Sequence, residues 1–214
     1  MGVRKFFAYL YDTVLKTMKI GDTSGSNYSS FTEKGFLRNV GEALQWDDIM
    51  GHRVAGTGLL TPAVTTIIGN LKLPSFASTG TDEEFWNFEI QHNTKLNSMA
   101  DIHFHGVPNI SSNGNIKMDI EVWKMHNGDP LSAVGDKYSV TKALTTANNA
   151  NFCVCEFTDA LDLTGLLVGD LIMVRLTRDN TVANNATGVM GSYQMGIHRQ
   201  IDGFGSDERW VKTL

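Results

Sequence analysis

Apolar and polar residues alternate along several short stretches of this chain, and the alternation predicts an antiparallel β protein. In residues 115–125 (NIKMDIEVWKM), every second residue from Ile116 to Val122 is apolar, and the residues between them are charged. This period of two is typical of a strand with one buried face. Residues 85–91 (FWNFEIQ) alternate in the same way. Residues 170–179 (DLIMVRLTRD) are more continuously apolar, which predicts a central strand.

Turn signals lie between these stretches. The pair Asn113-Gly114 separates residues 101–110 from the strand that follows, and it predicts a tight hairpin between the two strands. Residues 177–192 are rich in small and polar residues and predict a long exposed loop. Helical patterns are weak outside short stretches such as residues 142–150. Many short strands with few helices predict an all-β fold, a jelly-roll β-sandwich.

The first part of the chain differs in character from the rest. Residues 4–20 (RKFFAYLYDTVLKTMKI) leave helix and strand open, because their periodicity favours neither. Residues 21–30 (GDTSGSNYSS) form a polar loop. A length of 214 residues suits one large domain, or one domain with an appended segment. We predict an N-terminal arm or small adapter over residues 1–45 and the jelly-roll domain over residues 46–214.

Composition and charge narrow the class of protein. With 42% hydrophobic and 19% charged residues, the chain matches neither a disordered protein nor a coiled coil. A net charge of −5 argues against a nucleic-acid partner. Cys153 and Cys155 are two residues apart on an expected strand, where a disulfide would be strained, so we expect free thiols and a reducing site of synthesis. Neither a convincing secretory signal nor a run long enough to span a membrane is present, and we expect no membrane partner.

Residues 100–108 (ADIHFHGVP) contain the residues most suggestive of metal chemistry. If Ile102 and Phe104 face the core, His103 and His105 share the opposite face. His198, on the last expected strand, is a third candidate. Three histidines are enough for an open metal site, and the His-x-His pattern loosely resembles the cupins, which are jelly-roll proteins.

Two roles for these histidines stay open. The alternative role is a metal site in a cupin-like enzyme, or a site in a carbohydrate-binding module. Cupins, however, usually have a glutamate a few residues after the histidine pair, and residues 106–115 contain none. We favour a structural role, with the histidines on a solvated or subunit-facing strand surface, because an isolated His-x-His pair is short and common.

Other catalytic patterns are absent from the sequence. It contains no nucleophile turn of the Gly-x-Ser-x-Gly type, no phosphate-binding Gly-Lys-Ser loop and no His-Glu-x-x-His. Asp47 and Asp48 are adjacent, so on a strand they point to opposite faces and would not act as a pair. We therefore predict no catalytic residues, no cofactor and a non-enzymatic protein. The four tryptophans indicate core and interface packing: Trp46, Trp86, Trp123 and Trp210.

The order of these motifs resembles a group of tailed-phage virion proteins with a jelly-roll domain, over residues 35–210. Those proteins combine a Trp-Asp-Asp strand, a His-x-His strand, a Gly-Asp strand that ends in Arg-Asp, and a last strand with a histidine followed by a Gly-Ser pair. Gly106 and Gly196 depart from the pattern, which usually has an aromatic and an acidic residue there. The matching residues here are Trp46, Asp47, Asp48, His103, His105, Gly169, Asp170, Arg178, Asp179, His198, Asp202, Gly205 and Ser206.

The resemblance implies a non-enzymatic structural protein of a bacteriophage virion. It implies a homotrimer that decorates the capsid or forms part of a head fibre or tail appendage. The N-terminal segment, residues 1–45, would bind other capsid or tail proteins, and a glycan of the host surface is a further potential partner. Such a protein would be made in the host bacterial cytoplasm and located in the virion.

Overall fold

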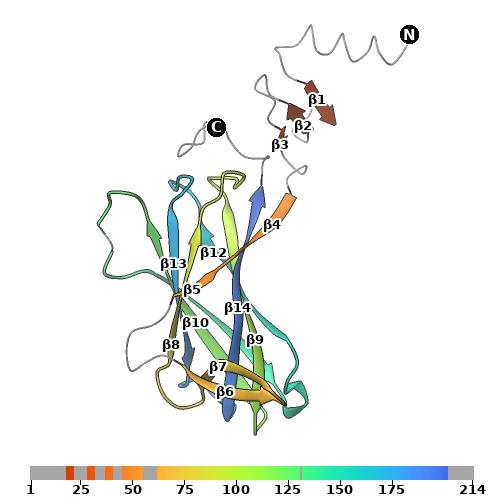
Figure 1. Ribbon diagram of the computed structural model, residues 1–214, viewed down its shortest axis with the longest axis vertical. Coiled ribbons are helices and arrows are strands. Elements are labelled where there is room, and N and C mark those ends of the chain that lie inside the picture. Colours follow the sequence, from red (N-terminus) through yellow and green to blue (C-terminus); the bar gives the residue numbers. More distant parts are fainter. Residues whose placement is uncertain are drawn as a thin grey trace, which may run out of the picture.

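The computed structural model describes residues 18–21, 28–31, 37–40, 45–54, 62–130 and 132–201. Two antiparallel sheets lie face to face and enclose one hydrophobic core (Figure 1). We call them the β9 sheet and the β13 sheet. The β9 sheet runs in the order β12 (Cys153–Asp162), β9 (Met99–Ile110), β14 (Gly188–Ile201), β7 (Leu71–Ala77) and β6 (Ala63–Ile68), with β4 (Gln45–Met50) also paired to β14. The β13 sheet runs in the order β11 (Asp136–Leu144), β10 (Gly114–Met125), β13 (Leu171–Asp179), β8 (Glu83–Glu89) and β5 (His52–Val54).

The path of the chain between the sheets is that of a jelly roll, which confirms the predicted fold class. From β7 to β10 each strand lies in the sheet opposite its predecessor, and β12, β13 and β14 alternate in the same way. Only β10 and β11 are consecutive neighbours in one sheet within this series. The first and last strands of the series, β7 and β14, pair with each other, as a jelly roll requires.

The alternation in the sequence predicts the inner faces of the strands correctly. The apolar residues of β10 from Ile116 to Val122 are buried, as are Trp86 and Phe88 on β8. Strand β13 has neighbours on both sides, β10 and β8, and occupies the centre of its sheet as predicted. Burial of these apolar side chains removes them from water, which is the main force that holds the two sheets together.

The predicted hairpin at Asn113-Gly114 is wrong. Strand β9 pairs with β12 and β14, whereas β10 pairs with β11 and β13, so the chain crosses from one sheet to the other here. Neither residue has the positive φ that a tight hairpin turn of this sequence needs. The crossing segment instead bonds to the chain before β14: Ser111 N donates to Thr187 O, and Asn115 N donates to Asn184 O. A side chain at Gly114 would overlap the backbone there, which accounts for the glycine.

The predicted loop over residues 177–192 is shorter than expected. Strand β13 continues to Asp179 and β14 begins at Gly188, so both ends of the segment are strand. The connection between them, residues 180–187, is held by the buried side chain of Arg178. Composition alone did not reveal this, because a polar segment has the same composition whether or not a neighbouring side chain bonds its backbone.

The N-terminal part of the chain contains a separate three-stranded antiparallel sheet, drawn beyond one end of the sandwich in Figure 1. It consists of β1 (Met18–Gly21), β2 (Tyr28–Phe31) and β3 (Leu37–Val40). Most of residues 4–20, for which helix and strand were both open, lies outside the described residues. That residues 1–45 act as a docking arm stays a prediction. Within the described chain, Cys153 and Cys155 are free thiols and no helix is long and apolar enough to cross a membrane.

Candidate functional site: a histidine face on the β9 sheet

The fold brings the three predicted histidines together on one surface. Ile102 and Phe104 are fully buried, so His103 and His105 point out of the β9 sheet as predicted. Strand β14 lies beside β9 and places His198 opposite Asp101, two residues before His103. The ring centres of His103 and His105 are 4.8 Å apart, and those of His103 and His198 are 6.4 Å apart.

Aromatic rings extend this cluster at both ends into one row. Trp46 on β4 lies 4.9 Å from His198, measured between ring centres. At the other end, the ring of Phe152 lies 5.0 Å from His105 and 5.9 Å from Tyr193. Trp46, Phe152 and Tyr193 are exposed to 50%, 57% and 55%. We call the outer surface that bears this row the histidine face; its outward residues are Trp46, Asp48, Met50, Asp101, His103, His105, Phe152, Val154, Glu156, Tyr193 and His198.

Gly196 allows His103 to lie flat against the sheet. The register pairs Gly196 with His103 across β14 and β9. A β-carbon at position 196 would lie 2.5 Å from Nε2 of His103 and 2.8 Å from its Cε1, which is closer than such atoms can approach. The missing side chain leaves the space that the imidazole fills, and His103 is only 8% exposed as a result.

The surroundings of the cluster favour neutral imidazoles. Burial is the largest effect on His103 and lowers its pKa, and the neighbouring His105 and His198 lower it further. Asp48 and Glu156 act in the opposite direction without reversing the shift. Burial also lowers the pKa of His105, against an opposing effect of Asp48. These are the directions expected when a cation loses water and has like charges nearby.

The cluster does not form a metal site within one chain. Among the described residues, no group of three His, Cys, Asp or Glu side chains is placed to hold a metal ion. Both ring nitrogens of His105 are shielded from solvent and lack a hydrogen-bond partner in the described part of the chain. An imidazole in this state leaves two polar atoms unsatisfied, which is costly unless another molecule supplies the partner.

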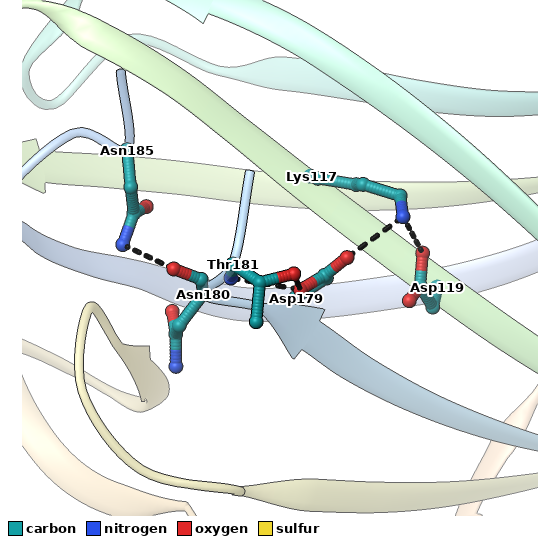
Figure 2. A network of polar contacts seen from close by, with 6 residues as sticks. All are labelled: Lys117, Asp119, Asp179, Asn180, Thr181 and Asn185. Carbon is teal, nitrogen blue, oxygen red and sulfur yellow. Dashed lines mark hydrogen bonds and ion pairs between the residues drawn. The ribbon is translucent and has the colours of Figure 1, made fainter. Parts of the chain in front are cut away.

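The opposite outer surface, on the β13 sheet, has a very different character. There Lys117 Nζ bonds Asp179 at 2.7 Å and lies 3.7 Å from Asp119 (Figure 2). Arg175, further along the same surface, contacts both Glu83 and Glu121. We call this surface the charged face. Its side chains pair with one another and remain accessible to water, as on an ordinary solvated sheet.

Several other residues that the sequence analysis named take part in the packing and hydrogen bonds of the fold. Asp47 and Asp48 point to opposite sides as predicted: Asp47 accepts a bond from the fully buried Arg199, whereas Asp48 is exposed on the histidine face. Asp170 is buried and accepts a bond from His126 Nδ1 at 2.8 Å. Trp86 is a core residue. The remaining residues of the motif and the last tryptophan lie outside the described residues: Asp202, Gly205, Ser206 and Trp210.

Sequence reasoning missed two rings of the row. Phe152 precedes β12 and Tyr193 lies at an irregularity of β14 between Ser192 and Gln194, where the register with β9 shifts. A regular alternation through β14 would not reveal which side Tyr193 takes, because a bulge resets the pattern. Phe152 lies outside any strand and gave no periodic signal.

Comparisons with known proteins assign no family. No family model matches the chain, and no curated protein matches it. Among solved structures it is similar to the CBM35 from Cellvibrio japonicus Abf62, at 12% sequence identity. The match covers 72% of this chain and 92% of that one, with a TM-score of 0.37. A likeness of this size identifies no function, and the described chain is characterised by its own fold, a jelly-roll β-sandwich.

Proposed function

We propose that this chain is a non-enzymatic structural protein of a tailed-phage virion, and that its jelly roll assembles into a homotrimer through the histidine face. The N-terminal segment, residues 1–45, would attach the trimer to capsid or tail proteins. The assignment to a virion rests on the order of motifs in the sequence. The mode of assembly rests on the contrast between the two outer faces of the sandwich.

That contrast is the observation that supports the proposal. The charged face bears ion pairs beside a small apolar pocket lined in part by Phe85, Trp123 and Met173. The four strands β4, β9, β12 and β14 contain a single lysine or arginine, the buried Arg199, although Asp48, Asp101 and Glu156 lie on the histidine face. Exposed aromatic side chains on the histidine face form a contiguous row instead. Interface centres are depleted in charge and enriched in aromatic residues. A closed symmetric oligomer would bury this surface once in every copy.

A second copy is the occupant that suits this face best. The exposed rings of Trp46, Phe152 and Tyr193 give it apolar area that a second copy would cover. The face also presents carboxylates, at Asp48 and Glu156, beside imidazoles, so the same surface offers both acceptors and groups able to donate. In a three-fold symmetric trimer each copy meets one neighbour through one part of its surface and the other neighbour through a different part, and a face that carries both donors and acceptors can supply both sides of such a contact.

We expect a trimer in a native mass spectrum at neutral pH. The variant Phe152→Ser should raise the dissociation constant of this trimer by about tenfold or more, because the loss of an aromatic side chain at an interface typically costs above 1 kcal/mol. The matched control is Phe85→Ser on the outer side of β8, which should leave the oligomer unchanged. A wild-type monomer at micromolar concentrations would contradict the proposed assembly. One metal ion per chain, lost in His103→Ala, would support the cupin-like alternative instead.

Attachment to the particle can be tested separately. A chain that lacks residues 1–45 should still form the trimer, because the jelly-roll strands begin with β4 at Gln45. It should no longer cosediment with phage particles, whereas the full chain should. Full decoration of particles by the shortened chain would show that the arm does not attach the protein.

A further inference from the structure

We propose that protonation of His103 and His105 separates the assembled subunits, so that association through the histidine face is reversed by mild acid. This inference rests on the proposed function, because it concerns the same face. Neither the fold nor the resemblance to virion proteins predicts that subunit association depends on pH.

The geometry concentrates positive charge when the cluster is protonated. The rings of His103 and His105 are 4.8 Å apart, and that of His198 is 6.4 Å from His103. Imidazolium ions on His103 and His105 at this spacing repel each other within each subunit. In a symmetric oligomer the same cluster recurs in every copy, so any contact that brings the clusters near each other multiplies the repulsion.

Three carboxylates and one ammonium group lie around the cluster and set its electrostatic surroundings. Strand β4 contributes Asp48, β12 contributes Glu156 and β9 contributes Asp101. The last of these is already engaged, since its Oδ1 accepts the backbone N–H of Asp159 at 2.7 Å. The ammonium group is that of Lys95, whose Nζ donates to Gln200 Oε1 at 3.0 Å, two residues along β14 from His198.

The direction of the pH effect follows from the state of the rings in one subunit. The pKa values of His103 and His105 are already lowered, chiefly by burial, and a covering subunit would remove more water and lower them further. Association would therefore favour the neutral rings, and the separated subunits would bind more protons. Affinity should be complete at pH values above the lowered pKa of these rings in the free subunit and fall as the pH drops below it.

The test is the dissociation constant of the full chain, measured by sedimentation at about pH 7.5 and about pH 5.5, a range in which histidine titrates while exposed carboxylates stay ionised. We expect it to rise by about tenfold per pH unit for each proton taken up on dissociation. In the variant His103→Gln/His105→Gln the dependence should flatten. His126→Gln, which removes a histidine paired to Asp170 elsewhere, should keep the wild-type dependence.

The outcomes distinguish the two proposals. A wild-type oligomer that is equally stable at both pH values overturns the pH dependence and leaves the proposed assembly standing. A monomer at both values overturns the proposed assembly itself. An unchanged pH dependence in the His103→Gln/His105→Gln variant shows that other groups control dissociation. Far-ultraviolet circular dichroism of each sample at both pH values separates dissociation from acid unfolding.

Discussion

Replacing Arg178 with methionine should lower the free energy of unfolding by about 3–5 kcal/mol, a loss large enough to leave many domains of this size marginally stable. Arg178 is only 5% exposed and occupies the inner side of β13, near the end of the sandwich. Within the described chain, none of the hydrogen bonds of its guanidinium goes to a carboxylate. It donates instead to three backbone carbonyls and one side-chain amide: those of Phe76, Ala186, Gly188 and Asn185.

These bonds explain the size of the expected effect. Nη1 reaches Gly188 O at 2.9 Å, and Nη2 reaches Asn185 Oδ1 at 2.9 Å. Methionine would fill part of the volume but would leave these acceptors buried without donors, at a cost of about 1–3 kcal/mol for each that water cannot reach. Burial lowers the pKa of Arg178 to about 10, so the group remains a cation at neutral pH.

Arg175→Met is the matched control for Arg178→Met. Arg175 lies on the same strand but on the charged face, where its side chain is about one-third exposed and pairs with Glu83 and Glu121. The pair with Glu83 is partly exposed and contributes about 0–1 kcal/mol. Glu121 is buried but keeps the bond that it accepts from Gly135 N, so this variant should lose less stability than Arg178→Met. Urea unfolding midpoints of the two variants provide the comparison. Equal losses would mean that Arg178 does not anchor the connection between β13 and β14.

The fold class was predictable because each strand of the sandwich repeats the same local rule. One face of β8, β10 and β13 is buried, so apolar residues recur at every second position and can be read from a short window. Which strands pair with each other was harder to predict from the sequence. The Asn113-Gly114 signal is local, whereas the crossing between sheets is decided by bonds to residues 184–187, about seventy residues later.

The candidate site was predictable in part for the same reason. That His103 and His105 share a face follows from the alternation of β9 alone. His198 and Trp46 lie beside these two histidines because of the registers of β14 with β9 and with β4. No local sequence pattern determines those registers. The virion motif usually has an acidic residue where this chain has Gly196. The structure gives a physical reason for the glycine, because it leaves space for the imidazole of His103 on the neighbouring strand.

Gly196→Val should abolish assembly while leaving the jelly roll folded. The new side chain would occupy the space of the His103 ring, whose Nε2 lies 2.5 Å from the position of an added β-carbon. The ring can rotate outward, because its outer side meets solvent in the isolated subunit, so the cost to folding should be about 1–2 kcal/mol. Outward rotation would place a displaced imidazole at the centre of the histidine face.

An interface that must match itself tolerates such a protrusion poorly. We expect the dissociation constant of the Gly196→Val protein to rise by about 30-fold or more, the effect of losing about 2 kcal/mol at a central contact. Ser139→Val, which adds bulk at an exposed position on the charged face, should change neither folding nor assembly. Sedimentation gives the oligomeric state and thermal unfolding gives the stability. If Gly196→Val remained a stable trimer, the subunits would have to meet through a surface other than the histidine face, because a ring displaced into this contact would hold two copies apart.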